Sequence, residues 1–454
     1  MPQRIPWKRI LAISFLLLLL AARLSLVGII RADPERSLWP DSSSYLFLTE
    51  RLLNGEGLHG DGSSFIDLTR TPGYPLFLWV VFSIAGGHDF ALVVFLQLLM
   101  GGLIALALYW IGDRFFNRAI GFTAAVIYLL TPNAALWAMA LLTDVPFTFL
   151  LTLSLVPAGL YIARSQVWPL VVAGMLLGCA ALVRPITTLI VAVWTVLIVL
   201  DGFIKRQPWK RTVLHAGIFL LSAGLFIGAW ILRNVLVWDR AMLSSISTWN
   251  LGHYMAPAAL ARAEGISIEA ARELIPTTRI PQPGERERYI AILLEHPWDF
   301  IVTHFQGVRI IFTEAGRPNF AHLLGVSSIG SGVVAAIKAL DFRGAIRLFF
   351  EAFQDPALRI VYPALAFSLA IQGLSYVLSV VGVVRSVWKP DRRTMGLIIV
   401  LLFTAVLLLF SPGVVGNSRF RVPAEPILAL LTAVGLWGGP SKNQDEETGG
   451  MIGS

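Results

Sequence analysis

The sequence predicts an all-α polytopic membrane protein, a bundle of about ten transmembrane helices with interfacial helices on its outer face. Of its 454 residues, 56% are hydrophobic and 14% are charged, whereas about a quarter of the residues in an ordinary soluble domain are charged. The apolar residues also form long runs that short polar segments separate. Runs of this length are typical of helices that cross a bilayer.

The first apolar run follows the N-terminal segment MPQRIPWKRI and extends from Ile10 to about Ile30. At about 1.5 Å per residue it is long enough to cross about 30 Å of hydrocarbon. Because it shows neither the shorter apolar core nor the small-residue cleavage site of a secretory signal, we expect an uncleaved anchor. Nine further spans are predicted at 89–112, 119–140, 145–163, 167–183, 185–204, 212–232, 359–384, 395–411 and 422–438.

Basic residues in the connections predict the orientation of these spans. With a cytoplasmic N-terminus, every strong basic cluster falls on the inner side, as the positive-inside rule requires. The clusters are Arg114 with Arg118, Arg164, KRQPWKR at 205–211, and Arg385, Lys389, Arg392 and Arg393. We therefore expect a multi-pass protein of the inner (plasma) membrane with both termini in the cytoplasm. The net charge of +8 does not indicate nucleic acid, because the cations form short clusters and no single stripe.

The predicted spans divide the chain into four parts. The parts are an N-terminal transmembrane module at 1–232 with its first external loop at 31–88, an external region at 233–358, C-terminal transmembrane helices at 359–440, and a polar tail at 441–454 that we expect to be disordered. In the first loop, 45–53 is amphipathic and 72–86 is apolar but too short to cross, so both predict interfacial helices that roof a cavity. The external region shows helical periodicity, and a weaker candidate span at 321–340 is placed outside the membrane.

Ionisable residues gather at the outer ends of the predicted spans. They are Asp41, Arg70, Asp144, Arg184, Arg233, Arg419 and Arg421. Several guanidinium groups around two carboxylates suit an anionic substrate that is reached from the lipid, because a planar guanidinium binds phosphate oxygens with two parallel hydrogen bonds. We therefore expect the functional site at the outer face.

The same residues lie in motifs that resemble a known family. The motifs are DSSSY at 41–45, RTPGYP at 70–75, LTDVPF at 142–147, ALVRP at 181–185, LRN at 232–234 and SRFRVPAEP at 418–426. Together, in this order over nearly the whole chain, they resemble bacterial GT-C-fold glycosyltransferases of family 39 and the aminoarabinose-transferase-like type, which are similar to protein mannosyltransferases. The resemblance implies transfer of a hexosyl or pentosyl group from a polyprenyl-phosphate carrier to an acceptor on the outer face, with a catalytic carboxylate in the first external loop.

This chemistry assigns a role to each candidate residue. Asp41 is the predicted base, which deprotonates an acceptor hydroxyl or phosphate, and Asp144 is a second acid that orients the acceptor. The predicted contacts to the donor phosphate are Arg70, Arg184, Arg233, Arg419 and Arg421, and the predicted lining of the substrate cavity is Tyr45, Tyr74, Asn234 and Tyr254. A single base implies direct displacement with inversion. The acceptor is a lipid, a glycan or a protein.

Each assignment has a simpler alternative. Asp41 could only cap the helix that starts at Ser42, and Asp144 could only favour the start of a transmembrane helix. Arg184 could mark the interface, where long basic side chains extend to water. Arg23 lies within the first span and is therefore a functional candidate by default, but because it could equally pair internally we leave it out of the site.

Metal and redox chemistry receive little support from the sequence. The histidines show no spacing typical of a zinc site, and three serines follow Asp41 where a paired acidic motif would supply a second carboxylate. Asp41 and Asp144 could nevertheless share a divalent metal. Cys179 is the one cysteine, which excludes an intrachain disulfide.

Two other classes of function remain open beside the enzyme. A transporter or flippase of lipid-linked sugars would show repeated halves and polar residues near the middle of the bilayer, and a non-catalytic assembly or receptor protein is the third class. The ionisable candidates gather at one face instead, which favours the glycosyltransferase.

Overall fold

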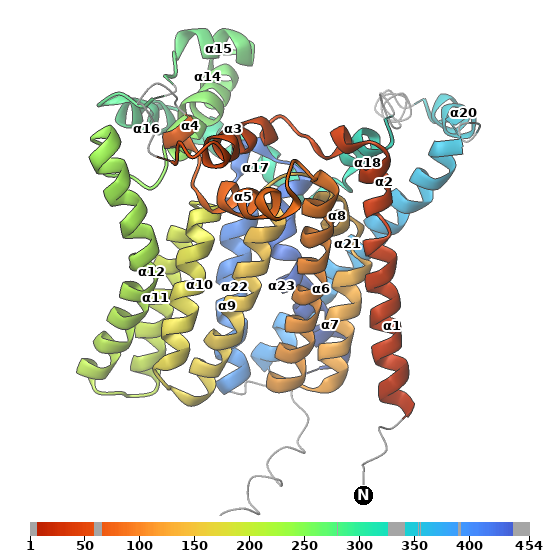
Figure 1. Cartoon of the computed structure of the whole chain (residues 1–454), viewed down its shortest axis with the longest axis vertical. Coiled ribbons are helices and arrows are strands. Elements are labelled where there is room, and N and C mark those ends of the chain that lie inside the picture. The colour runs from red at the N-terminus through yellow and green to blue at the C-terminus, as the bar shows by residue number, and fades with distance from the viewer. Residues whose placement is uncertain are drawn as a thin grey trace, which may run out of the picture.

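A computed structural model describes residues 7–58, 66–278, 280–325, 341–352, 354, 356–388 and 392–438. Within these ranges the secondary structure is helical and no strand occurs. The described helices run between two opposite ends of the molecule, called here the upper and the lower end as in Figure 1. The all-α class expected from the sequence is confirmed.

Each of the ten predicted spans coincides with an apolar helix or a pair of helices. In the described part of the chain, seven helices are long and apolar enough to cross a membrane, and a bent pair makes an eighth. The other two predicted spans correspond to Trp168–Val183 and Thr394–Phe410, which are apolar but shorter. The polytopic architecture is therefore confirmed.

The N-terminal module supplies most of the bundle. Its long helices are α1 (Trp7–Leu24), α6 (Phe90–Phe115), α7 (Arg118–Leu130), α9 (Asp144–Arg164), α10 (Trp168–Val183), α11 (Thr187–Ile204) and α12 (Trp209–Trp238). The short α2 (Val27–Ala32) continues the first span. Helix α10 packs against both α9 and α12, and α6 packs against α7 and α9. The predicted module boundary at 232 falls inside α12, which continues to Trp238.

Three C-terminal helices complete the bundle. They are α21 (Pro356–Trp388), α22 (Arg392–Phe410) and α23 (Glu425–Trp437). Helix α23 packs against α21 and α7, while α22 contacts α9 and α11. The C-terminal helices therefore lie against helices of the N-terminal module, and the large apolar core includes side chains from both.

The predicted span at 119–140 is not one straight helix. Helix α7 ends at Leu130, and α8 (Pro132–Ala138) continues at an angle of 57°. Pro132 has no backbone N–H, which suits the first position of a new helix and interrupts the old one. The break leaves carbonyl groups of α7 without intrahelical partners, and Arg23 binds them.

Arg23 is 5% exposed and holds this break. Its guanidinium donates to the carbonyl oxygens of Tyr128 at 2.5 Å, Leu129 at 2.7 Å and Thr131 at 2.9 Å. The guanidinium also lies 5.1 Å from the centroid of the Tyr128 ring. Of the two explanations open from the sequence, internal pairing is the one that the structure supports.

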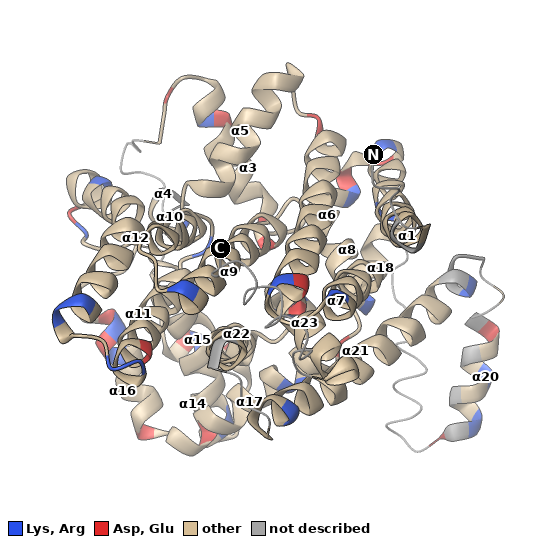
Figure 2. Cartoon of the chain, turned by 90° about the horizontal axis from the view of Figure 1, so that it is seen from below, with Lys and Arg blue, Asp and Glu red and all other residues tan. Residues whose placement is uncertain are grey.

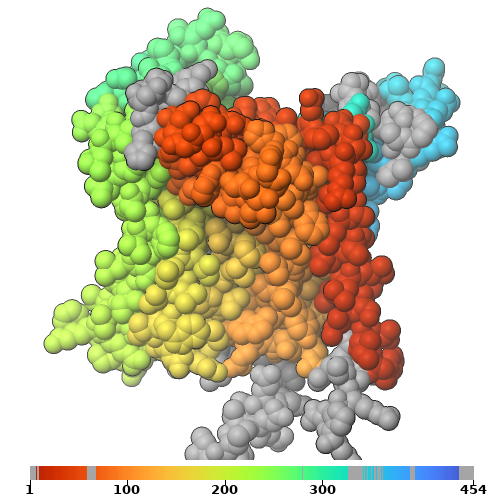
Figure 3. Space-filling view, viewed as in Figure 1, coloured from red at the N-terminus to blue at the C-terminus, as the bar shows by residue number. Residues whose placement is uncertain are grey.

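Shorter helices form a layer over the upper end. In the first loop they are α3 (Ser42–Leu53), α4 (Ile66–Thr69) and α5 (Gly73–Ala85), preceded by the 3-10 helix η1 (Pro34–Ser37). Figure 3 shows this red and orange segment lying across the upper ends of the yellow helices. Helices therefore lie at the predicted positions 45–53 and 72–86, and they cover the bundle.

The external region adds further helices to this layer. They are α13 (Ile246–Asn250), the π-helix η2 (Leu251–Met255), α14 (Ala256–Glu264), α15 (Ile268–Leu274), α16 (Glu285–Glu295), α17 (Pro297–Thr313), α18 (Arg317–Leu324) and α20 (Phe342–Ala352). The helical periodicity read in this region is confirmed. Most of the weak candidate span at 321–340 lies outside the described residues, as does the tail at 441–454.

Charged residues mark the lower end of the bundle. The connections α6–α7, α9–α10 and α11–α12, which hold Arg114, Arg164 and the 205–211 cluster, all lie there (Figure 1). Figure 2 looks at this end and shows largely tan helices with blue residues near helix ends and connections. The basic clusters thus share one end of the molecule, as the topology expected from the sequence requires.

Candidate functional site

Two carboxylates from distant segments meet at the upper end of the bundle. Arg419 joins them, because its Nη1 lies 2.7 Å from Oδ2 of Asp41 and its Nε lies 2.7 Å from Oδ2 of Asp144. Asp41 directly precedes α3, Asp144 begins α9, and Arg419 lies in the 3-10 helix η4 (Ser418–Ala424). The structure therefore brings together three residues that the sequence places at the outer ends of predicted spans.

Two more arginines complete this cluster. Nη2 of Arg70 lies 2.8 Å from Oδ1 of Asp41, and Nη2 of Arg184 lies 2.5 Å from Oδ1 of Asp144. Every oxygen of the two carboxylates thus accepts from a guanidinium. We call Asp41, Arg70, Asp144, Arg184 and Arg419 the upper charge cluster, and its three cations exceed its two anions by one positive charge.

Neighbouring side chains fix two of the guanidinium groups. Nε of Arg70 donates to Oγ of Ser44 at 2.9 Å, and its guanidinium lies 4.8 Å from the centroid of the Tyr45 ring. Nε of Arg184 donates to Oγ1 of Thr143 at 2.9 Å. Both arginines therefore have defined orientations before any ligand binds, which lowers the entropy cost of a further contact.

The position of Asp41 follows from its neighbour Ser42. Oγ of Ser42 accepts from the backbone N–H of Trp39 at 2.9 Å and donates to the carbonyl oxygen of Leu141 at 2.9 Å. This bond ties the start of α3 to the segment just before Asp144. The side chain of Asp41 makes no capping hydrogen bond to α3, so capping does not account for an acid at this position.

Close backbone packing joins the segment that follows Arg70 to the segment that precedes Arg184. A Cβ added to Gly73 would lie 2.6 Å from the carbonyl oxygen of Leu182 and 2.8 Å from Cγ2 of Val183. Glycine therefore allows the start of α5 to rest on the last turn of α10. Oγ1 of Thr71 also donates to the carbonyl oxygen of Val183 at 3.3 Å.

Hydrogen bonds to the backbone of η4 fix the position of Arg419. Its N-cap Asn417 accepts from the Arg419 backbone N–H through Oδ1 at 2.9 Å, and the Ser418 N–H donates to Oε2 of Glu314 at 2.8 Å. Nδ2 of Asn133, in α8, donates to the Ser418 carbonyl oxygen at 3.0 Å and to Oε1 of Glu425 at 2.7 Å. The broken helix α7–α8 thus supports the loop that carries Arg419.

The two carboxylates differ in access to water. The side chain of Asp41 is 39% exposed, whereas that of Asp144 is fully buried. Partial burial alone would raise the pKa of Asp41, but ion pairs with Arg419 and Arg70 outweigh that effect and hold it well below its ordinary value. Asp41 is therefore ionised and accessible, while Asp144 is enclosed by arginines.

Arg233 and Arg421 lie outside the upper charge cluster. Arg233, near the end of α12, donates to the carbonyl oxygen of Leu58 and to Oδ1 of Asn234 at 2.8 Å. Arg421 is 3% exposed and donates to the carbonyl oxygens of Ile311 at 2.5 Å and Glu314 at 3.0 Å. The structure therefore does not bring these two arginines to the two carboxylates, and their predicted phosphate contacts stay predictions.

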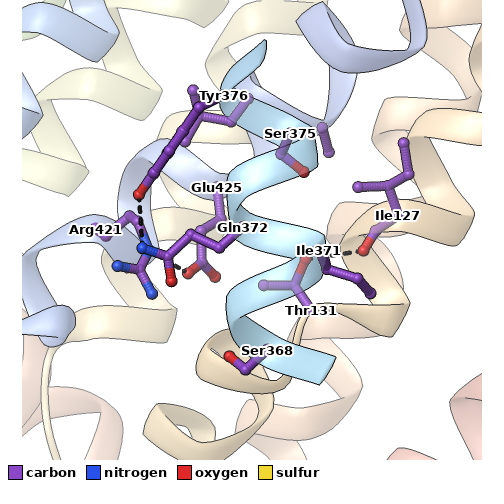
Figure 4. Close-up of a pocket in the computed structure, with 11 residues that line it drawn as sticks. Ile127, Thr131, Ser368, Ile371, Gln372, Ser375, Tyr376, Arg421 and Glu425 are labelled. Atoms are coloured by element: carbon purple, nitrogen blue, oxygen red, sulfur yellow. Dashed lines mark hydrogen bonds and ion pairs between the residues drawn. The ribbon is translucent and has the colours of Figure 1, made fainter. Parts of the chain in front are cut away.

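Arg421 belongs to a buried polar group of its own. Its Nε lies 3.3 Å from Oε1 of Glu425, and together they line a cavity of about 20 Å³ beside α21. Figure 4 shows Arg421 and Glu425 next to Gln372 and Tyr376, with a hydrogen bond of 3.0 Å between the last two. Nε and Nη1 of Arg421 are thus already paired inside the protein.

The four residues predicted to line a substrate cavity have different surroundings. Tyr45 lies against Arg70 of the cluster, whereas Tyr74 is buried behind it and donates to Oε1 of Gln97 at 3.0 Å. Asn234 donates to the Met242 carbonyl oxygen at 2.8 Å and so closes the turn after α12. Tyr254 lies in the 233–358 region, where its ring centroid is 5.8 Å from Cζ of Arg272. Only Tyr45 of these four contacts the upper charge cluster directly.

Several residues that support the cluster received no role from the sequence. They are Ser44, Asn133, Thr143, Glu314 and Glu425. Three of them lie within or beside quoted motifs, because Ser44 belongs to DSSSY, Thr143 to LTDVPF and Glu425 to SRFRVPAEP. Adjacency to the motifs was therefore the available signal, whereas Asn133 and Glu314 had none.

A metal shared by the two carboxylates would have to displace arginine. Among the residues that the structure describes, no three His, Cys, Asp or Glu side chains are arranged to hold a metal ion. All four carboxylate oxygens of Asp41 and Asp144 already accept from guanidinium groups. The cluster thus suits an anion better than a cation.

Comparison with known proteins adds a family and a fold. Residues 69–232 match the model of the dolichyl-phosphate-mannose-protein mannosyltransferase family. This segment contains Arg70, Asp144 and Arg184 of the upper charge cluster, while Asp41 and Arg419 lie outside it. No curated protein matches the sequence significantly.

A solved structure of an archaeal enzyme shares the arrangement of helices. The apo oligosaccharyltransferase of Archaeoglobus fulgidus is 13% identical to the chain, with a TM-score of 0.53, over 95% of this chain and 51% of that one. A second structure is described as oligosaccharyltransferase AglB from Archaeoglobus fulgidus in complex with an inhibitory peptide and a dolichol-phosphate, at 12% identity and a TM-score of 0.49, over 95% of this chain and 50% of that one. The chain thus spans about half the length of these enzymes.

Similarity at this level of identity concerns the fold alone. The helix arrangement agrees over nearly the whole chain, and the family match covers the segment that contributes most of the bundle. The resemblance found in the motifs is thereby confirmed. The chain is a polytopic membrane protein of the GT-C glycosyltransferase fold, similar over residues 69–232 to the dolichyl-phosphate-mannose-protein mannosyltransferases.

Proposed function

We propose that the protein is a membrane glycosyltransferase that moves a sugar from a polyprenyl-phosphate donor to an acceptor hydroxyl or phosphate on the outer face of the membrane. The observation that carries this proposal is the bridge that Arg419 makes between Asp41 and Asp144, with Arg70 and Arg184 on the remaining oxygens. Both the family match and the fold agree with a sugar transferase.

The arginines of the cluster bind the donor phosphate. Three guanidinium groups against two carboxylates leave one excess positive charge, and guanidinium binds phosphate oxygens in parallel pairs. Arg70 is the most accessible of the three, with 18% of its side chain exposed. A lipid phosphate held at the ends of the spans would therefore reach Arg70 before the other two.

Asp41 is the base. Its carboxylate is exposed enough to meet an acceptor, whereas the buried Asp144 instead orients Arg184 and Arg419. In the free protein the ion pairs make Asp41 a weak base, because they hold its pKa low. A donor phosphate that draws Arg70 or Arg419 away would strengthen the base at the moment when it is needed.

The proposed reaction is a single displacement with inversion. Asp41 takes the acceptor proton, the acceptor oxygen forms a bond to the anomeric carbon, and the bond to the carrier phosphate breaks. The departing polyprenyl phosphate gains negative charge, which the arginines stabilise. A single accessible carboxylate supports attack from one face, by analogy with inverting glycoside hydrolysis.

A lipid-linked donor fits the molecule better than a nucleotide sugar. The described residues contain no strand and therefore no sheet of a nucleotide-binding domain. The basic connections lie at the end opposite the cluster, so the positive-inside rule supports a cluster on the outer side, where cytosolic nucleotide sugars are absent. We accordingly propose the inner (plasma) membrane as the location.

The direct test is to incubate the purified full-length protein with a panel of polyprenyl-phosphate sugars and membrane extract. Mass spectrometry should find a product that carries the sugar and should find free polyprenyl phosphate in equal amount. Arg70→Gln should give less product under the same conditions, because it removes a proposed donor contact of the cluster. Turnover of a nucleotide sugar without turnover of its polyprenyl-phosphate counterpart would refute the proposed donor.

A further inference from the structure

A second cavity lies far from the upper charge cluster. It has a volume of about 120 Å³ and is surrounded by α9, α10, α11, α12 and α22. Its α9 residues, Ala158 to Ile162, follow Asp144 by 14 to 18 positions, which places them about 21–27 Å along the helix at about 1.5 Å per residue. The cavity is therefore in the lower half of the bundle.

The lining of this lower cavity is almost entirely apolar. Leu170, Ala173, Phe219 and Val400 are examples from three of its walls. One water molecule takes up about 30 Å³ in the liquid, and apolar cavities that are large enough for several waters bind hydrocarbon instead. The lower cavity thus suits a segment of a hydrocarbon chain.

A hydrocarbon chain can enter this cavity from the surface of the bundle. Leu200 and Ile204 of α11 line it, and they are 48% and 68% exposed. Higher in the bundle α11 and α22 are joined, because Nε1 of Trp194 donates to Oγ1 of Thr404 at 2.9 Å. The opening therefore lies below this contact and faces the bilayer.

The lower end of the cavity is polar and leads to basic residues. Asp201 lines the cavity and pairs with Nζ of Lys205 at 2.8 Å. Nη2 of Arg211 donates to the carbonyl oxygen of Ser165 at 3.3 Å, which places Arg211 at the adjoining α9–α10 connection. Cations outnumber the acid here; they are Arg164, Lys205, Arg206, Lys210 and Arg211.

Two exposed tryptophans mark the level of the lipid headgroups at this end. Trp168, at the start of α10, is 54% exposed, and Trp209, at the start of α12, is 67% exposed. Tryptophan is enriched where the bilayer meets water. Arg211 and Lys210 directly follow Trp209, so their charges lie at the depth of lipid phosphates.

We propose that the lower cavity binds one anionic phospholipid, with an acyl chain between α11 and α22 and its phosphate on Lys210 and Arg211. The apolar lining selects a chain, and the excess of cations selects an anionic headgroup. The site is separate from the donor site, because it lies at the opposite end of the bundle from the upper charge cluster. The bound chain fills a void and holds α22 against α11.

Native mass spectrometry of the full-length protein tests this proposal. Detergent-solubilised protein is mixed with equal amounts of phosphatidylglycerol and phosphatidylcholine, and one retained phosphatidylglycerol per protein is expected. The Lys210→Gln/Arg211→Gln double variant should lose retention by roughly 30-fold, because each cation near an anionic surface contributes about fivefold. Arg114→Gln/Arg118→Gln is the matched control, since both residues lie at the same end but at the α6–α7 connection.

A cavity-filling variant separates the chain from the headgroup. Ala173→Leu places three carbons in the cavity and should reduce retention without changing surface charge, while gel filtration verifies that the variant stays folded. Equal retention of phosphatidylcholine, or equal loss in the Arg114→Gln/Arg118→Gln control, would overturn the proposal. Displacement by inorganic phosphate would show an ion site without a chain, and displacement by polyprenyl phosphate at equal concentration would assign the cavity to the donor instead; either result also refutes it.

Discussion

Nε of Arg419 donates to Oδ2 of Asp144 at 2.7 Å, although 275 residues separate the two along the chain. Nη1 of the same guanidinium lies 2.7 Å from Asp41. One side chain of η4 therefore pairs with both carboxylates. The predictions that follow concern this coupling and the helices that maintain it.

Asp41→Asn should abolish turnover while donor binding stays largely intact. An amide cannot take a proton from the acceptor, and general base catalysis contributes about 10²–10⁴-fold. Because the Asp41 side chain does not cap α3, the variant should fold normally. Single-turnover assays and donor binding on the same preparation measure the two effects separately.

The matched control for this variant is Asp33→Asn. Asp33 also pairs with an arginine, Arg36 at 2.9 Å, but it lies outside the upper charge cluster. It should keep near-wild-type turnover. If a well-folded Asp41→Asn protein did the same, the role of base would move to Asp144.

The pH profiles of kcat and of kcat/KM should differ on their acid side. In the free protein the pKa of Asp41 is held below its ordinary value, so kcat/KM should not fall until the pH drops below about 4. Donor phosphate competes for Arg70 and so raises the pKa of Asp41 in the complex. The acid limb of kcat should therefore lie at higher pH than that of kcat/KM, and coincident limbs would contradict the proposed competition.

Stability should depend on Asp41 in acid. Its pKa is lower in the folded protein than the ordinary value of about 3.9 that applies to an unfolded chain. The ion pairs therefore contribute stability that is fully present above pH about 4 and is lost as the pH falls toward the folded pKa. Thermal unfolding from pH 3 to 7 should show wild type losing Tm more steeply than Asp41→Asn below pH about 4; parallel curves would contradict this.

Arg70 and Arg421 should give opposite results when replaced by glutamine. Arg70→Gln should weaken donor binding by roughly 10- to 100-fold, because a charge-assisted hydrogen bond contributes about 1.5–3 kcal/mol, and it should lower Tm less than Arg421→Gln does, because Arg70 is 18% exposed whereas Arg421 is 3% exposed. Arg421→Gln should lower Tm, since it leaves Glu425 and two carbonyl groups with weaker partners. Donor titration and calorimetry on both variants test the contrast, and a binding defect without a loss of Tm in Arg421→Gln would restore its predicted phosphate contact.

Arg23→Met should destabilise the bundle by roughly 2–3 kcal/mol. Methionine has similar length but leaves three carbonyl groups at the α7–α8 break without their donor. Arg23→Lys should recover part of the loss, because an ammonium can reach some of these oxygens. Thermal unfolding measures the series, and Arg31→Met, at the end of α2, is a control that should change little.

The sequence was most informative about features that depend on neighbouring residues or on the length of apolar runs. Apolar runs located the ten helical spans, and the short run at 72–86 was separated from them because about fifteen residues cannot cross. The sequence also placed five motif residues at one end of the bundle, because each lies at the outer end of a predicted span or just beyond it. They are Asp41, Arg70, Asp144, Arg184 and Arg419. Their pairing could not be read in advance, because it depends on side-chain directions in three separate loops.

The remaining differences have tertiary causes. The run at 119–140 is apolar on average although it contains Thr131, Pro132 and Asn133, so mean hydropathy alone does not reveal the break at Thr131 that Arg23 stabilises from another helix. Arg421 lies two positions after Arg419 and shares its motif, yet the turn of η4 directs it into the protein. A charged residue at the end of a span indicates how deep that residue lies in the membrane. It does not by itself indicate where its side chain points.

The separation of Asp41 and Arg419 also has a consequence for biosynthesis. The two residues are 378 positions apart, so at about 5–20 residues per second the ribosome adds Arg419 roughly 20–80 s after Asp41. During that interval Arg70 is the one arginine of its two cluster partners that the nascent chain can offer to Asp41. The upper charge cluster is thus completed only when η4 has been made, and on the proposed function a chain that stalls earlier in insertion would be inert.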